Sequence, residues 1–189
     1  MRTFQIHTLQ TAPAEGIPAL RALKQGLGFV PNLAAAMAES PALITGFVDL
    51  RNQLATTGTL TGIEREIIAL AVSIENNCDY CMAAHSTFAL MQNAAEETIT
   101  AARAGDAPGD PGLGALYRFT RTLVAKNGHV SGEDTQALLN AGYSRSAVFE
   151  LVAQVAHTTM ANLAHSISHA PLDQAFAPQA WMPCRRYAP

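Results

Sequence analysis

Apolar residues recur every three or four positions along most of the chain, which is the spacing of amphipathic helices. Signals for helix ends accompany this pattern, because Ser40 and Ser144 are suitable N-caps and Thr61 with Glu64 has the sequence of a capping box. No segment alternates between apolar and polar residues as a strand would. We therefore expect helices over residues 18–26, 32–39, 41–57, 62–75, 78–92, 95–104, 115–127, 132–141 and 145–170.

Short connections between these helices favour an all-α, single-domain helical bundle. The segment 105–114, GDAPGDPGLG, is expected to be a loop because it is rich in glycine, proline and aspartate. Apolar residues surround much of the helix at 62–75, so we expect this helix to be buried on most sides. The domain would cover residues 1–189, with its core over about 31–172, an irregular lead-in over 1–17 and a tail over 173–189.

Composition narrows the functional classes. Hydrophobic residues make up 49% of the 189 residues and charged residues only 14%, so a monomer has little charge with which to solvate its surface, and we expect a homo-oligomer. A net charge of −3 without a basic cluster gives no support to a nucleic-acid partner. No apolar run is long enough to cross a membrane, and the first residues lack a leader pattern, so we expect a cytoplasmic protein.

Two of the three cysteines, Cys78 and Cys81, form a C-x-x-C motif at the start of a predicted helix that Asn77 can cap. Residues at i and i+3 share a helix face, so the two sulfurs can approach each other. The partial positive charge of a helix N-terminus favours the thiolate, the form that attacks peroxides and disulfides. In a reducing compartment such a pair indicates redox or metal chemistry rather than a structural disulfide. The third cysteine, Cys184, is expected to be inert.

His85 and Glu66 are the proton-handling candidates beside this pair. His85 follows Cys81 by four residues, about 6 Å along the helix axis, and Cys78 by seven, about 10 Å, so His85 can contact Cys81 but hardly Cys78. Imidazole beside a thiol can take its proton. Glu66 precedes Cys78 by twelve residues on the preceding helix. If the two helices pack as a hairpin, its carboxylate can be buried beside the thiols and shuttle a proton.

The spacing Glu-x11-Cys-x2-Cys-x3-His, within LTGIEREIIALAVSIENNCDYCMAAHS, resembles the AhpD-like (alkylhydroperoxidase D-like) branch of the carboxymuconolactone decarboxylase superfamily. Glu66, Cys78, Cys81 and His85 match the pattern in register, and the similarity extends from about residue 31 to 172. It implies an oligomeric helical enzyme without a bound cofactor. In the implied peroxidase reaction, Cys81 attacks a hydroperoxide, Cys78 resolves the sulfenate to a disulfide, and an external dithiol, from a lipoyl-bearing or thioredoxin-like protein, reduces it.

Tyr80 stands where the better-studied AhpD pattern has a histidine, which places the resemblance closer to the peroxidase-related relatives. A tyrosine titrates near pH 10, so it lines a pocket or packs rather than relaying protons at neutral pH. Decarboxylation of a muconolactone is not expected, since the decarboxylases of the superfamily lack the cysteine pair. Two other functions stay open: a redox-sensing or scaffold oligomer with little turnover, and a protein that binds metal through the cysteines and His85.

For several residues a structural role competes with a functional one. The two cysteines can be small buried hydrophobes, and a structural zinc site would need a fourth ligand. Glu66 can be a surface carboxylate paired with Arg65. On the last helix, His165 and His169 stand at i and i+4 as a possible metal pair, although no glutamate follows in the H-E-x-x-H form. His157 lies on the apolar stripe of that helix, where we expect a hydrogen-bonded core histidine.

Overall fold

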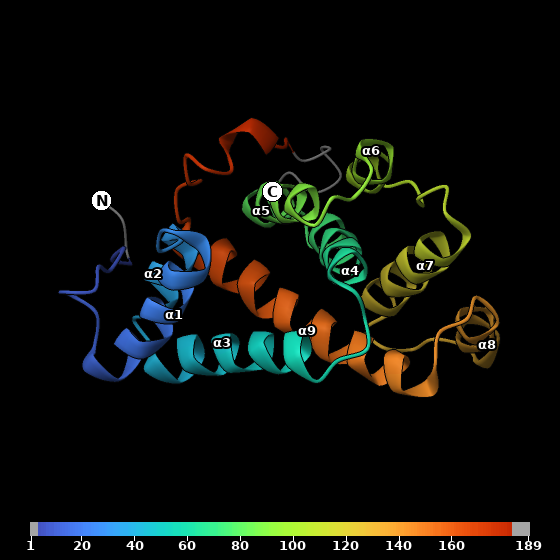
Figure 1. The fold of residues 1–189 in the computed structure, drawn as a ribbon, viewed down its shortest axis with the longest axis horizontal. Coiled ribbons are helices and arrows are strands. Elements are labelled where there is room, and N and C mark those ends of the chain that lie inside the picture. The colour runs from blue at the N-terminus through green and yellow to red at the C-terminus, as the bar shows by residue number, and fades with distance from the viewer. Residues whose placement is uncertain (1–3, 183–189) are drawn as a thin grey trace.

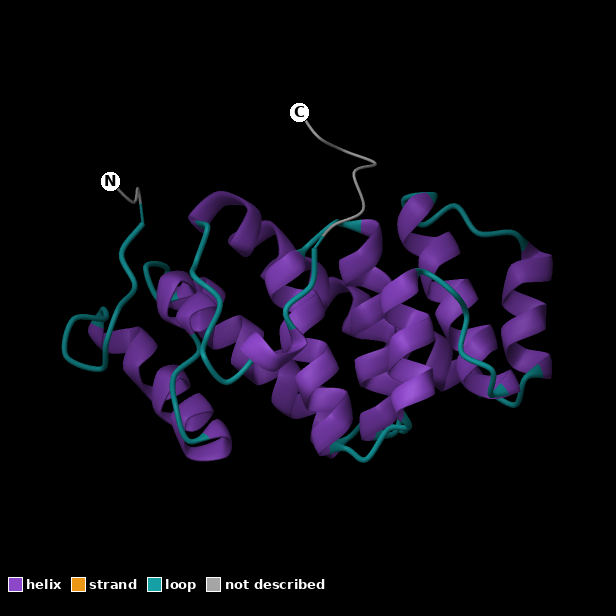
Figure 2. Cartoon of the chain, turned by 90° about the horizontal axis from the view of Figure 1, so that it is seen from above, coloured by secondary structure: helices purple, strands orange, loops and turns teal. Residues whose placement is uncertain are grey.

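The computed structural model describes residues 4–182, and within this range all regular structure is helical (Figure 2). The all-α prediction is therefore confirmed. Short 3-10 helices at Ala14–Gly16 and Ala177–Gln179 flank nine α-helices. In chain order these are α1 (Ile17–Leu27), α2 (Asn32–Met37), α3 (Pro41–Thr56), α4 (Gly62–Glu75), α5 (Asp79–Met91), α6 (Glu96–Ala104), α7 (Pro111–Ala125), α8 (Gly132–Asn140) and α9 (Arg145–Ser168).

Helix α4 lies at the centre of the fold and packs against α5, α7 and α9 (Figure 1). Its N-terminus is fixed by the capping box, in which the Thr61 side chain accepts from the backbone of Glu64 and the Glu64 carboxylate accepts from the backbone of Thr61. Every residue from 67 to 73 is buried, which confirms that this helix is enclosed on most sides.

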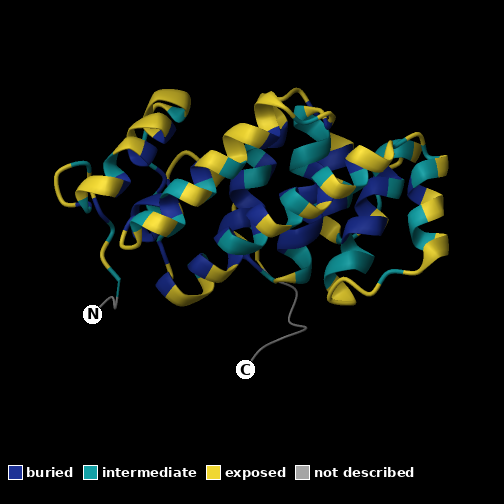
Figure 3. Cartoon of the chain, turned by 90° about the horizontal axis from the view of Figure 1, so that it is seen from below, coloured by how far each residue is buried: buried dark blue, intermediate teal, exposed yellow. Residues whose placement is uncertain are grey.

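The long helix α9 joins the two halves of the molecule, with α1 to α3 at one end and α6 to α8 at the other (Figure 1). Its Ser144 N-cap accepts a hydrogen bond from the backbone of Ala147, as expected. Buried residues line its inner side, whereas its outer side is exposed (Figure 3). None of the described helices combines the length and the hydropathy needed to cross a bilayer.

Four helix starts differ from the sequence expectation, α1 and α6 by a single residue, and the starts of α7 and α5 have identifiable causes. Helix α7 begins at Pro111 rather than at 115, because Asp110 caps it through the backbone of Leu113 at 2.8 Å and proline fits the first helical position. The expected loop is therefore shorter than 105–114. Helix α5 is capped by Cys78 and not by Asn77. Asn77 instead has a φ of 54°, a left-handed conformation that asparagine adopts more readily than most residues.

The segment after α9 is packed rather than a free tail. Phe176 is 2% exposed, and its ring contacts the rings of Phe29, Tyr80 and Phe88 with centroids 5.4–5.9 Å apart. Trp181 donates its indole N–H to the carbonyl oxygen of Arg103 at 3.2 Å. The segment therefore covers α5 and supplies part of the site below. Cys184 lies outside the described residues.

Candidate active site

The turn between α4 and α5 places Cys78 at the N-cap of α5. The left-handed Asn77 reverses the chain, and the backbone N–H of Cys78 donates to the Ser73 carbonyl at 2.9 Å, closing the end of α4. The sulfur of Cys78 then accepts the backbone N–H of Cys81 at 3.4 Å. The sulfur takes the N-cap position that a serine or aspartate oxygen usually occupies, so the partial positive charge of the helix N-terminus stabilises the thiolate of Cys78.

The two cysteines are both free and buried, 4% and 2% exposed. The hydrogen bond from the Cys81 side chain is the main cause that lowers the pKa of Cys78 to about 5; burial opposes it, while His165 and the Cys81 backbone reinforce it. The same hydrogen bond and burial raise the pKa of Cys81. At neutral pH the pair therefore holds one negative charge, centred on Cys78.

His165 of α9 is a partner of Cys78 that the sequence analysis assigned elsewhere. Its Nδ1 lies 3.8 Å from the Cys78 sulfur and 3.6 Å from a carboxylate oxygen of Asp79. Burial lowers the pKa of His165, but Cys78 and Asp79 outweigh burial and raise it above the ordinary value. The alternative pairing of His165 with His169 is not formed, because His169 is exposed at the left-handed C-cap of α9.

Glu66 and His85 form the second polar pair of the site. The His85 Nδ1 and a Glu66 carboxylate oxygen are 2.7 Å apart, and the side chains are 14% and 19% exposed. The helices α4 and α5 pack as a hairpin, and this packing brings the Glu66 carboxylate to His85 of the motif. Arg65, the rival partner of Glu66, instead donates to the carbonyl oxygen of Leu60 at 2.5 Å. Glu66 is thus not a surface carboxylate paired with Arg65.

Cys81, His85 and Glu66 line one cavity of about 340 Å³. Its walls come from α1 to α5, α9 and the segment after α9, and most of the lining is apolar. Cys78 does not line this cavity and instead faces His165. The two cysteines therefore have different surroundings: Cys81 lines the cavity beside the Glu66–His85 pair, and Cys78 faces an imidazole and a helix N-terminus.

Tyr80 lines the same cavity, but its hydroxyl is engaged elsewhere. It donates to Asp173 at 2.5 Å and accepts the backbone N–H of Leu33 at 3.3 Å. Asp173 also accepts the backbone N–H of Asn32, so the pair holds the start of α2. Burial and Asp173 raise the pKa of Tyr80 far above its ordinary value. Tyr80 therefore links α5 to the start of α2 and to the segment after α9 at the cavity wall. This is consistent with its expected role as a pocket residue that does not relay protons.

His157 differs from the expectation of a hydrogen-bonded core histidine. It is buried and lines the cavity, yet neither ring nitrogen has a hydrogen-bond partner among the described residues. Its ring stacks on Phe47 with centroids 4.0 Å apart. Within residues 4–182, no group of three or more histidine, cysteine, aspartate or glutamate side chains is arranged to hold a metal ion.

A sequence model of the carboxymuconolactone decarboxylase family matches residues 41–117, which contain Glu66, both motif cysteines and His85. The fold matches the alkylhydroperoxidase AhpD core of an uncharacterised peroxidase-related protein from Ralstonia eutropha JMP134, with a TM-score of 0.82 over 93% of this chain and 94% of that chain. The sequence match covers residues 41–117, and the fold is AhpD-like. This confirms the resemblance inferred from the motif.

Other solved structures extend the range of proteins with this AhpD-like fold. A peroxidase-related protein from Silicibacter sp. TM1040 matches with a TM-score of 0.77 over 92% of each chain. A cysteine-to-alanine variant of the debrominase Bmp8 in complex with 2,3,4-tribromopyrrole matches with a TM-score of 0.73 over 86% of this chain and 87% of that chain. Sequence identity is 22% to the Ralstonia protein and 21% to the other two. A comparison with curated protein sequences gave no match.

The residues that the sequence analysis missed all lie far from the motif along the chain. His165 and Asp173 follow Cys78 by 87 and 95 positions, and Phe176 was placed in the tail. One signal was present: His165 follows the buried polar residue Asn162 by about one turn of α9. A polar side chain on a buried helix face needs a partner, and here the partner is the motif cysteine.

Proposed function

We propose that this AhpD-like protein is a thiol-dependent oxidoreductase that reduces organic hydroperoxides through Cys81 and Cys78. The supporting observation is that Cys81 and the hydrogen-bonded Glu66–His85 pair line one cavity, while Cys78 lies outside it at the helix N-cap. A substrate in the cavity meets Cys81 first. A half-buried carboxylate and imidazole beside it can accept and return a proton.

In the first half-reaction His85, held by Glu66, accepts the proton of Cys81. The Cys81 sulfur attacks the hydroperoxide, so that an S–O bond forms and the O–O bond breaks. The alkoxide takes the proton back from His85 and leaves as an alcohol. The sulfur of Cys81 is now a sulfenic acid, oxidised by two electrons, and the hydroperoxide is reduced by two electrons.

In the second half-reaction the Cys78 thiolate attacks the Cys81 sulfur. An S–S bond forms, the S–O bond breaks, and the departing hydroxide takes a proton to become water. An external dithiol, of the lipoyl or thioredoxin type, then reduces the disulfide and is itself oxidised. His165 and the backbone N–H of Cys81 still stabilise the Cys78 thiolate when Cys81 is part of a disulfide, so Cys78 is the better leaving group when that dithiol attacks.

The test is turnover of cumene hydroperoxide with dihydrolipoamide as reductant, together with the single-cysteine variants. We expect Cys78→Ser to accumulate a sulfenic acid at Cys81 that reacts with dimedone, and Cys81→Ser to lose peroxide reduction. Trapping of the sulfenic acid at Cys78 in the Cys81→Ser variant would reverse the assignment. A disulfide that forms after one equivalent of peroxide without turnover would support the redox-sensing alternative instead.

Reductive dehalogenation is a second candidate, favoured by the aromatic lining that Phe47, Phe88 and Phe176 give the cavity and by the likeness to the debrominase fold. The electron balance is the same: Cys81 takes the halogen from carbon, a proton replaces it there, and Cys78 displaces halide as the disulfide forms. Release of bromide from a bromophenol with dihydrolipoamide, without cumene hydroperoxide reduction, would favour this reaction over the first.

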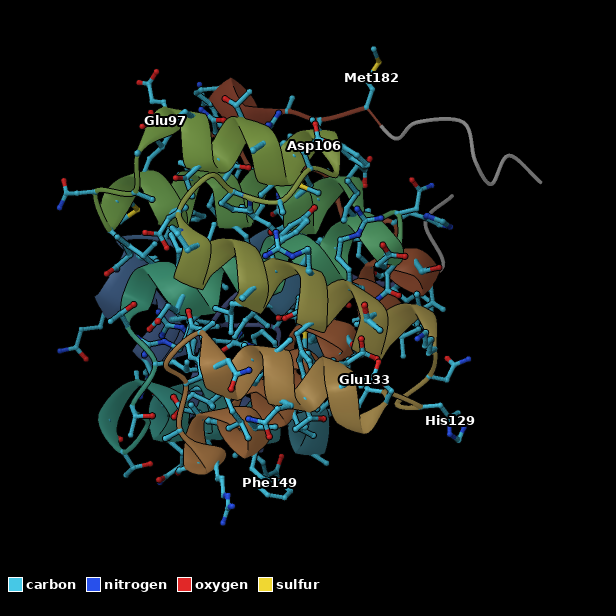
Figure 4. The ribbon with its side chains drawn as sticks, turned by 90° about the vertical axis from the view of Figure 1, so that its right-hand side faces the viewer. Glu97, Asp106, His129, Glu133, Phe149 and Met182 are labelled. Carbon is cyan, nitrogen blue, oxygen red and sulfur yellow. The ribbon has the colours of Figure 1, made fainter. Side chains whose placement is uncertain are left out.

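The protein is proposed to act as a homo-oligomer. The outer side of α9 exposes Phe149, Val152, Leu163 and Ile167, each between 46% and 77%. Phe149 projects away from the helix in Figure 4. Such a continuous apolar face on a weakly charged protein is typical of a subunit contact. Light scattering should therefore give a mass above 20.0 kDa, and Leu163→Glu should lower it.

A further inference from the structure

The C-terminal end of α9 meets the N-terminal end of α5, and an imidazole faces a thiol at this junction. His165 lies in the last turn of α9, and Cys78 is the N-cap of α5. The imidazole Nδ1 is 3.8 Å from the sulfur. A helix C-terminus favours a positive charge and a helix N-terminus favours a negative one, so both helix ends stabilise an imidazolium–thiolate pair here.

Two further side chains of α5 face the imidazole of His165. Asp79, in the first turn of α5, is exposed and has a carboxylate oxygen 3.6 Å from the same Nδ1. The ring of Tyr80 packs against the imidazole with centroids 5.2 Å apart, but its hydroxyl is bonded to Asp173. Cys78 and Asp79 are therefore the two acidic groups whose charge acts on this imidazole.

The redox state of Cys78 changes the balance that sets the pKa of His165. Burial has the largest single effect and lowers this pKa. The hydrogen bond and the charge of Cys78 are the main effects that raise it, followed by Asp79 and the backbone of Ala170. A disulfide sulfur carries no charge. When Cys78 enters a disulfide, only Asp79 and the backbone oppose burial, so the pKa of His165 falls.

We propose that His165 is a second catalytic acid–base group, which holds a proton while Cys78 is a thiolate and releases it when Cys78 enters the disulfide. The inference rests on the proposed function for its place in turnover. It names the source of the proton that the hydroxide leaving Cys81 requires. His85 is not that source, because it has already returned its proton to the alkoxide.

The half-reactions then balance within the protein. The Cys78 thiolate attacks the sulfenic sulfur of Cys81, the S–S bond forms, the S–O bond breaks, and the hydroxide takes the proton released by His165 and leaves as water. In the reductive step the external dithiol supplies two electrons and two protons. One proton goes to Cys81 and the other to His165, while Cys78 departs as the thiolate. Neither step needs a net exchange of protons with solvent.

The first test is an NMR titration of the histidine rings in the full-length native protein, with the resonances assigned by triple-resonance spectra. One sample is reduced with a phosphine, and the other is oxidised to the disulfide with diamide. We expect the proton affinity of His165 to be about tenfold or more lower in the disulfide form. His169, which is exposed at the C-cap of the same helix, is the matched control and should titrate equally in both forms.

The second test counts protons through the redox equilibrium with dihydrolipoamide. For the native protein, the equilibrium constant should not change with pH between the two measured pKa values of His165 and above the pKa of Cys78. In His165→Asn no group takes up the second proton. Above the pH midpoint of Cys78 alkylation in that variant, the constant for reduction should therefore rise about tenfold per pH unit.

Equal His165 titrations in the two redox forms would overturn the inference, and so would a native equilibrium constant that rises tenfold per pH unit in that interval. Neither measurement uses a hydroperoxide or requires the variant. A redox-dependent His165 in a protein that reduces no hydroperoxide supports the inference and rejects the proposed function, and hydroperoxide reduction with a redox-independent His165 does the reverse. Failure of diamide to join the two motif cysteines would overturn both.

Discussion

Replacing His165 with asparagine should make Cys78 a weaker acid. The imidazole Nδ1 is 3.8 Å from the sulfur, and it supports the thiolate by a hydrogen bond and by its charge. The hydrogen bond from Cys81 and the backbone N–H at the helix N-cap remain in the variant. The pKa should therefore rise from about 5 without returning to the ordinary value of 9.0.

The magnitude follows from the distance. An opposite charge within this range changes a pKa by about 1–3 units. The pKa of Cys78 should then lie between about 6 and 8, starting from about 5 in the native protein. At pH 6 the thiolate fraction would fall from about 90% to between about 50% and 1%. Cys81→Ala should raise the pKa further than His165→Asn, because the Cys81 hydrogen bond is the largest cause of the shift.

The assay is the rate of iodoacetamide alkylation at Cys78 against pH, followed by peptide mass spectrometry on the reduced protein. His169→Asn is the matched control, since His169 is exposed at the C-cap with a φ of 48°, a conformation that asparagine tolerates. A midpoint that stays near 5 in His165→Asn, or that moves equally in His169→Asn, would refute the argument from geometry.

Three further outcomes test other parts of the structure. Glu66→Gln should lower kcat/KM for cumene hydroperoxide by about 10²–10⁴-fold, because His85 loses its carboxylate partner and becomes a weaker base. The pH midpoint of Cys78 alkylation should not change in this variant. Tyr80→Phe should lower the free energy of unfolding by about 1–3 kcal/mol, because the buried Asp173 loses a donor, and a denaturation midpoint equal to that of the native protein would contradict this. The pKa of His157 is lower in the folded protein than in the unfolded chain, so its contribution to stability is complete above pH 6.5 and is lost as the pH falls toward 3. The loss is at most about 5 kcal/mol. In His157→Phe, the free energy of unfolding measured with urea should depend less on pH over that interval.

Much of the secondary structure was predictable because it depends on neighbours in the chain. The Thr61–Glu64 capping box and the Ser40 and Ser144 caps involve residues three apart, and all three formed as expected. The start of α5 was wrong by one residue for an equally local reason. Asn77 was expected to cap the helix, but it forms the left-handed turn, and the cysteine sulfur is the cap instead.

The sequence alone determined the motif that brings two thiols to one helix start and a histidine one turn further along. These spacings become distances through the rise of a helix, and the short α4–α5 turn adds Glu66 to the same set. It also determined the family resemblance, because the four residues are in register.

The tertiary structure decided which residues surround each thiol. His165 reaches Cys78 because α9 packs across α5, and His157 and Arg51 share a cavity because α3 packs on α9. No periodicity encodes these contacts, since they arise from how helix faces pack after the chain has folded. The packing therefore determines that Cys78 lies beside an imidazole and that Cys81 lines the cavity, and the motif supplies only the two sulfurs.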